Sequence, residues 1–246
     1  MICSRQTGIS ISLMSQVPPL QSESSPPRQR MAPAERERLI VAEATRYFAE
    51  YGLQAGTTEL ARRLRITQPL LYKYFPTKMA LIERVYADLF PSDESRRWER
   101  LLEDRSLPVA QRIKTFYLEY AARIFSYEHV RLFLFSGLAK HDFNQRYYAR
   151  LTDRMFTRIA RALREEYGNG DLAVPITDDE MELVQSLHGA IYHIAFRRWV
   201  HGASAKQDIP TTVKRKVDIF LDGARQIMRQ TAEATRSEPG GKKQGQ

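Results

Sequence analysis

Residues 57–78 read TTELARRLRITQPLLYKYFPTK, and this stretch decides the fold of the N-terminal part of the chain. Its apolar residues recur at helical spacing on both sides of a break near residues 66 and 67. The pattern predicts one short helix that ends near Arg65 and a second that runs from Gln68 to about Phe75. Two short helices joined by a tight turn form a helix-turn-helix, in which the first helix supports the second.

The second helix has its own start and stop signals. Thr67 is a good N-cap residue, and Pro69 lies in the first turn, where its missing N–H would have no intrahelical partner. Pro76 ends the helix. Thr77 can cap a following helix, whose apolar stripe begins at Leu81.

The second helix presents an unusual surface once its two inward residues, Leu71 and Phe75, are set aside. The residues left on or near its exposed side are Gln68, Pro69, Leu70, Tyr72, Lys73 and Tyr74. The cations nearby in sequence are Arg62, Arg63, Arg65 and Lys78, with only Glu59 opposing them. Such a surface suits contacts with phosphates and base edges. Taken separately, the tyrosines are also compatible with ordinary packing, and the arginines with a solvated helix face.

The segment LYKYFPTK, preceded by LRIT, resembles the signature of the tetracycline-repressor (TetR) family of bacterial transcription factors. Upstream, RERLIVAEATRYFAEYG resembles the first helix of that family, and Gly52 ends it. The resemblance covers about Arg36 to Val85. It implies an all-α fold, with a three-helix DNA-binding domain followed by a helical ligand-binding and dimerisation domain. It also implies a ligand-responsive repressor that binds a near-palindromic operator as a homodimer.

The resemblance assigns separate roles to residues of the helix-turn-helix. Contacts with bases in the major groove are implied for Gln68, Pro69, Leu70 and Lys73. Contacts with phosphates are implied for Thr57, Thr58, Thr67, Tyr72, Tyr74 and Lys78. Phosphate contacts set the position of a protein on DNA, whereas base contacts choose the sequence.

Two positions depart from the pattern of the family. Arg65 stands where the family usually has glycine, and an arginine at positive φ costs on the order of 1 kcal/mol. Either the turn is strained or the first helix of the motif ends differently. The segment between Gly52 and Ala61 is one residue shorter than expected, so Thr57 is the candidate N-cap of that helix.

Composition agrees with a nucleic-acid partner. The 246 residues carry a formal net charge of +9 and give a sequence pI near 9.7, which favours an anionic partner. No apolar run approaches the length of a membrane span, so we expect no membrane partner. The single cysteine, Cys3, excludes a disulfide framework and suits a reducing cytoplasm, where we expect the protein to act.

Four regions follow from composition and periodicity. We expect a disordered arm over 1–32, a DNA-binding domain over 33–79, an effector-binding and dimerisation domain over 80–230 and a disordered tail over 231–246. Some or all of the arm could come from an upstream start codon, with Met14 or Met31 as alternative starts. Alternatively, Arg28 and Arg30 could touch DNA beside the main site.

The C-terminal region reads as helices throughout. A long helix is predicted from about Asp142 to Tyr167, and a capping box of Thr177 and Glu180 starts another that runs to about Trp199. This helix and the last one carry small pairs at 189–190 and 223–224, which let helices approach closely. The family resemblance implies a homodimer through these two helices, although packing within one chain could use some of the same residues.

An aromatic-rich stretch lies between the helix-turn-helix and these last helices. The candidate ligand-pocket residues are Tyr117, Tyr120, Phe156, His188 and Tyr192, with an effector of unknown identity. The alternative for each of them is plain core, which is the commoner role for such a residue. An effector that favoured a non-binding state by about 1 to 3 kcal/mol would loosen DNA about 5- to 150-fold.

An enzyme is the main alternative class. The five histidines have no metal-binding spacing, and the acidic run Asp178, Asp179 and Glu180 occupies the first turn of a capped helix, where negative charge is stabilising. No nucleophile elbow, phosphate loop or dinucleotide fingerprint occurs. We therefore predict no catalytic residue, no metal and no cofactor. A helical adaptor that binds only protein would leave the exposed Tyr72-Lys73-Tyr74 face unexplained.

Overall fold

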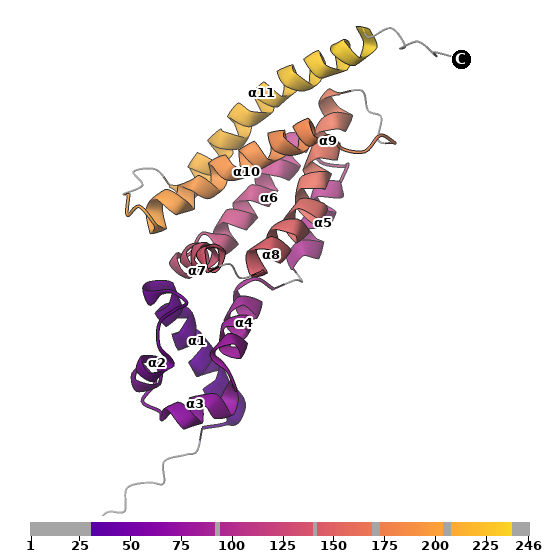
Figure 1. Ribbon diagram of the computed structural model, residues 1–246. Helices are drawn as coiled ribbons and strands as arrows, with labels where there is room; N and C mark the ends of the chain where they lie inside the picture. The colour runs from indigo at the N-terminus through magenta and orange to yellow at the C-terminus, as the bar shows by residue number, and fades with distance from the viewer. Residues whose placement is uncertain (1–30, 92–93, 140–141, 169–172, 204–207, 238–246) are drawn as a thin grey trace, which may run out of the picture.

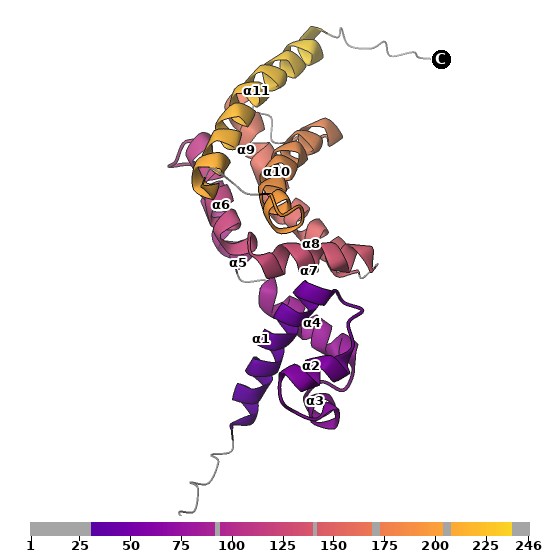
Figure 2. The same ribbon diagram turned by 90° about the vertical axis from the view of Figure 1, so that its left-hand side faces the viewer.

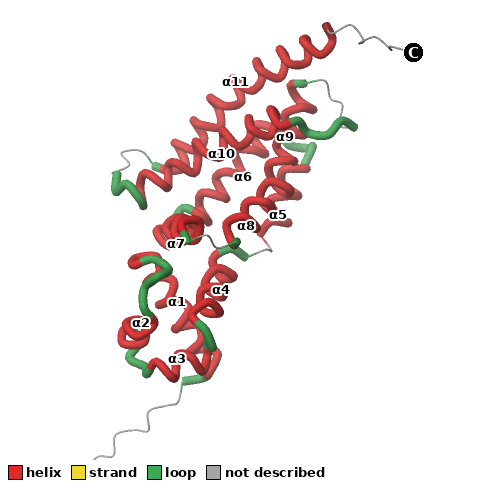
Figure 3. The backbone as a smooth tube through the Cα atoms, viewed as in Figure 1, coloured by secondary structure: helices red, strands yellow, loops and turns green. Residues whose placement is uncertain are grey.

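The computed structural model describes residues 31–91, 94–139, 142–168, 173–203 and 208–237, and all regular structure in these ranges is helical (Figure 3). The predicted all-α class is therefore confirmed. The expectation for residues 1–30 lies outside the described residues.

The N-terminal unit consists of four helices. They are α1 (Pro33–Tyr51), α2 (Thr57–Arg63), α3 (Gln68–Tyr74) and α4 (Lys78–Leu89). The apolar stripe of α1, which includes Ile40 and Phe48, packs on Leu60 of α2, Leu71 of α3 and Val85 of α4. Every one of these side chains is almost fully buried, and they belong to one hydrophobic core that continues into the C-terminal helices.

The C-terminal unit is larger and holds the remaining helices. They are α5 (Glu94–Glu103), α6 (Val109–Ile124), α7 (Tyr127–Leu138), α8 (Phe143–Leu151), α9 (Thr157–Tyr167), α10 (Asp178–Trp199) and α11 (Ile209–Ser237). A π-helical turn, Thr152–Phe156, joins α8 to α9 without a break. Figures 1 and 2 show α3 at one end of the molecule and α10 and α11 at the other. The predicted boundary between residues 79 and 80 falls inside α4.

Polar contacts of α7 join the two units. His129 Nε2 donates to the Leu89 carbonyl at the end of α4, with a distance of 2.7 Å. Tyr86 of α4 donates its hydroxyl to the carbonyl of Leu132, also at 2.7 Å. Arg131 Nε lies 2.6 Å from the carbonyl of Ala49 in α1. Both α1 and α4 are thus tied to the same helix of the C-terminal unit.

Several helix boundaries confirm the sequence signals. The side chains of Thr67 and Thr77 accept hydrogen bonds from backbone N–H groups of α3 and α4. Thr177 and Glu180 form the predicted capping box of α10. Glu180 also forms a salt bridge with Arg164 of α9. The N-cap of α7, Ser126, was not predicted.

Two boundary predictions were wrong. Helix α2 is capped by Gly56, so Thr57 is its first helical residue and not its N-cap. Helix α11 continues to Ser237, although the tail was expected to be disordered from residue 231. The stretch TAEATRS lacks apolar residues beyond alanine but contains no helix breaker, so the helix outlasts its apolar stripe. Residues 238–246 lie outside the described residues.

Candidate nucleic-acid interface and effector cavity

Helix α3 forms the end of the N-terminal unit that faces away from α7 (Figure 1). Leu71 anchors it to the core, and the C-cap residue Phe75 is also buried. On the other side, Pro69 and Lys73 are exposed, and Leu70 is half-buried. The structure therefore brings three of the four candidate base-contacting residues to one outer face.

The fourth, Gln68, belongs to a small hydrogen-bond cluster. Its Nε2 donates to Thr57 Oγ1 at 3.0 Å, and the hydroxyl of Tyr72 lies 2.9 Å from the same oxygen. Thr57 is only 7% exposed, so its hydroxyl holds α2 and α3 together. The neighbouring Thr58 is exposed and stays available to a phosphate.

Two of the cations near the turn are already paired with carboxylates. Arg62 forms a salt bridge with Glu59 at 2.7 Å. Arg63 lies within 3.9 Å of carboxylate oxygens of Glu43, Glu50 and Glu59 and over the rings of two tyrosines of α1. The expectation that only Glu59 opposes these arginines was wrong, because α1 supplies two further carboxylates.

Two cations of the motif differ from these arginines. Over the described ranges, neither Arg65 nor Lys73 forms a salt bridge. Arg65 has φ 54° and is the only residue other than glycine with positive φ in the part of the chain that the structure describes. The expected strain in the turn is thus present, and the Arg65 side chain is exposed.

The remaining candidate phosphate contacts flank α3. Thr67 and Tyr72 are exposed, whereas Tyr74 is half-buried against the core. The ammonium group of Lys78 lies 6.0 Å from the ring centroid of Phe48, and partial burial lowers the pKa of Lys78. Cations and hydroxyl groups on both sides of α3 can therefore reach the backbone of a nucleic acid.

A cavity of about 200 Å³ lies in the C-terminal unit and reaches the end of α4. Its lining residues are Phe90, Tyr120, Ile124, Phe133, Tyr147, Tyr148, Leu151, His188, Gly189 and Tyr192. Of the five candidate pocket residues, Tyr120, His188 and Tyr192 lie in this wall. Tyr117 and Phe156 do not line it; their rings pack behind His188, with centroids 6.1 and 4.8 Å away.

The polar groups of the cavity are uncharged at neutral pH. Burial lowers the pKa of His188 to about 4, so its imidazole is neutral. Burial also raises the pKa of Tyr120 and of Tyr192, which keeps both phenols protonated. His188 Nε2 lies 3.5 Å from the Tyr120 hydroxyl, and His188 Nδ1 has no hydrogen-bond partner.

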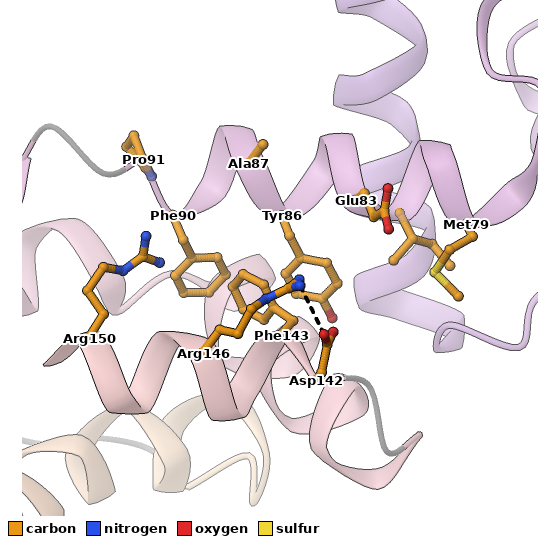
Figure 4. A pocket seen from close by; sticks show the side chains of 11 residues that line it. Met79, Glu83, Tyr86, Ala87, Phe90, Pro91, Asp142, Phe143, Arg146 and Arg150 are labelled. Atoms are coloured by element: carbon orange, nitrogen blue, oxygen red, sulfur yellow. Dashed lines mark ion pairs between the residues drawn. The ribbon is translucent and has the colours of Figure 1, made fainter. Parts of the chain in front are cut away.

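A second hollow, of about 410 Å³, lies between α4 and α8 (Figure 4). The rings of Tyr86, Phe90 and Phe143 lie between the two helices, and the guanidinium groups of Arg146 and Arg150 extend from α8 toward α4. Arg146 is paired with Asp142 at 2.9 Å. Phe90 lines both this second hollow and the cavity of about 200 Å³, so the two spaces share its ring as part of their walls.

Sequence reasoning missed Phe90 as a site residue. It follows α4 and precedes Pro91, and this position by itself predicts only a helix end. Its role depends on contacts with Phe133 of α7 and Phe143 of α8. Both residues lie more than forty positions later in the chain.

No group of acidic, histidine or cysteine side chains that could hold a metal occurs within the described ranges. In the same residues, no helix is both long enough and apolar enough to span a bilayer.

Together, the two units form an all-α chain with an N-terminal helix-turn-helix and a helical C-terminal unit. A model of the bacterial regulatory proteins of the tetR family matches residues 40–85. This match covers α2 and α3 and parts of α1 and α4, so the N-terminal unit is similar to that of the tetR family.

Solved structures of low sequence identity share the fold. AmtR of Mycobacterium smegmatis is 18% identical, with a TM-score of 0.55 over 86% of this chain and 97% of that one. A candidate TetR-family transcriptional regulator from Mesorhizobium loti is 16% identical, with a TM-score of 0.53 over 79% of this chain and 98% of that one. A search of curated proteins found no match.

Proposed function

We propose that this protein is a sequence-specific transcriptional repressor that binds a near-palindromic operator as a homodimer and releases it when a small molecule binds. The observation that carries the proposal is the outer face of α3, where exposed Lys73 forms no salt bridge among the described residues; exposed Arg65, in the turn before α3, forms none there either. Unpaired cations beside a capped, solvent-facing helix match the charge and shape of a DNA major groove.

Residues of this face have separable roles in the proposal. Lys73 donates to a base edge, and Leu70 and Pro69 make apolar contacts with thymine methyl groups. Gln68 reads a base with the part of its amide group that the bond to Thr57 leaves available. Thr58, Thr67, Tyr72, Tyr74 and Lys78 hold phosphates. The internal hydrogen bonds of Thr57 support a positioning role for that residue rather than a direct contact.

The homodimer of the proposal uses exposed surface of α10 and α11. Gly189 and Gly223 lie exposed on these helices, and a Cβ atom at either position would meet nothing within 4 Å. Packing inside the chain therefore does not require glycine at either position, whereas close approach of a second copy does. Two α3 helices related by a twofold axis would enter successive major grooves, about 34 to 36 Å apart.

Fluorescence anisotropy with DNA from upstream of the protein's own gene and with scrambled DNA tests the proposal. The upstream DNA should bind more tightly, and Lys73→Gln should reduce the discrimination by about 1 to 3 kcal/mol at a defined base pair. Lys214→Gln removes the same charge from exposed α11 and is the matched control. Equal affinity for both DNAs at moderate salt would contradict sequence-specific binding. Such a protein would act in the cytoplasm, where bacterial DNA lies.

A further inference from the structure

The cavity next to α4 has a wall without a charged side chain. Aromatic rings from α6, α7, α8 and α10 make up most of the wall. Its exposed members are Tyr148 and Gly189, and its buried end is formed by Tyr120 and His188. A charged ligand would lose its hydration there and find no countercharge, so the wall selects an uncharged ligand.

One polar atom at the buried end of the cavity, Nδ1 of His188, makes no hydrogen bond. The His188 residue is only 8% exposed. Buried polar atoms in folded proteins are nearly always paired, so a ligand hydroxyl that reaches Nδ1 once the imidazole turns toward the cavity would supply the missing bond. A neutral imidazole has one donor and one acceptor nitrogen, and a hydroxyl group can serve either. A ligand hydroxyl therefore fits His188 in both tautomers.

The volume and shape of the cavity limit the rest of the ligand. A protein cavity of about 150 Å³ is known to hold benzene, so about 200 Å³ has room for one six-membered ring with a small substituent. The rings of Tyr120 and Phe125 meet edge to face, as do those of Phe133 and Tyr147. An aromatic ligand can continue this packing at no cost in polar contacts.

We propose that the cavity binds an uncharged compound with a single aromatic ring and a hydroxyl group, a simple phenol, whose hydroxyl pairs with His188. The assignment rests on the proposed function, because it specifies the chemical class of the effector. The ligand would also touch Phe90, the C-cap residue of α4. Since α4 directly follows α3 and Thr77, this contact links the occupied cavity to the DNA-binding helix.

Calorimetric titration of the full-length protein without DNA tests the assignment, with phenol, toluene, benzoate and benzylamine as probes. Phenol should bind at one site per chain, and the two charged probes at least tenfold more weakly. His188→Leu should weaken phenol at least tenfold and leave toluene unchanged, whereas His188→Gln should restore part of the phenol affinity. His193→Leu alters an exposed histidine of the same helix and is the matched control.

Three results would overturn the assignment. These are benzoate or benzylamine binding as tightly as phenol, an unchanged phenol affinity in His188→Leu, and no phenol binding at millimolar concentration by a protein that still binds its operator. The last result leaves the proposed function intact. Phenol binding that follows the expected variant pattern but never releases DNA supports the chemistry of the cavity and contradicts the proposed ligand response instead.

Discussion

Arg65 combines a strained backbone with a positive charge that forms no salt bridge within the described ranges. Its φ of 54° lies in the left-handed region, which glycine adopts at little cost. Arg65→Gly should therefore raise the free energy of unfolding by up to about 1 kcal/mol, measured by urea denaturation. The same change should weaken DNA binding and lower the slope of log affinity against log salt by about 1. Unchanged DNA affinity would mean that Arg65 touches no phosphate.

A separate variant isolates the charge of Arg65 from the backbone strain. Asparagine tolerates positive φ better than arginine and carries no charge. Arg65→Asn should thus lose DNA affinity as Arg65→Gly does. If only Arg65→Gly weakened binding, flexibility of the turn and not the lost charge would be the cause.

The buried imidazole of His188 should make stability depend on pH. Its pKa is lowered to about 4, below the ordinary value near 6.5, so the unfolded chain takes up a proton first as the pH falls. The free energy of unfolding should accordingly fall by about 2 kcal/mol between pH 7 and pH 5 on account of this residue. His188→Gln should remove that part of the slope, whereas the exposed His193→Gln should retain it. Parallel slopes in the wild type and His188→Gln would contradict the buried neutral state.

At the residue scale, local signals were predictable and distant partners were not. The caps Thr67 and Thr77 depend on atoms within three residues, and the strain at Arg65 depends on its own backbone. Arg63 was misjudged because its carboxylate partners in α1 lie 13 and 20 positions earlier in the chain. Periodicity can place a residue on a face, but it does not identify what packs opposite.

Helix α7 is the element that connects the two units, and Ser126 fixes its start. The Ser126 hydroxyl accepts from the backbone N–H of His129 and lies 2.8 Å from His129 Nδ1. Ser126→Ala should therefore lower the free energy of unfolding by about 1 kcal/mol, measured by urea denaturation. Ser186→Ala, on the exposed side of α10, is the control and should have almost no effect. Equal effects of the two changes would show that the cap is unimportant.

At the element scale, periodicity and breakers predicted most helices but not their irregularities. The predicted helix from Asp142 to Tyr167 exists as one run, yet residues 152–156 form a π-helical turn within it. No glycine or proline marks that turn, and its wider spacing brings Met155 and Phe156 into the core. The π-helical turn depends on how neighbouring helices pack, so its own residues do not predict it.

For the whole molecule, the arrangement of the two units gives the cavity a physical route to α3. Phe90 lies in the cavity wall, and the carbonyl of the preceding Leu89 is hydrogen-bonded to His129. Helix α4 runs from there back to its N-cap, Thr77, which closely follows α3. A ligand that prefers a shifted position of Phe90 must therefore move α4 against α7 or strain these bonds. Under the proposed ligand response, coupling requires a difference in ligand affinity between the two positions, and we expect that difference to arise at Phe90.

The exposed apolar surface of α11 yields the prediction that concerns the whole assembly. Ile219 is 67% exposed in the single chain, on the same side of α11 as Gly223, and should lie in the proposed interface. Ile219→Glu would place charges in that interface without disturbing the core of the chain. Light scattering should then give the mass of one chain, 28.5 kDa, where the unaltered protein gives twice that mass.

Leu138→Glu provides the matched control for the dimer, because Leu138 is 72% exposed at the end of α7, away from α11. This variant should retain the mass of two chains. Operator affinity should fall in Ile219→Glu and not in Leu138→Glu, since one half-site contact is weaker than two held in register. If Ile219→Glu remained dimeric, the interface would have to lie elsewhere on the molecule, and the predicted separation of the two α3 helices would no longer follow.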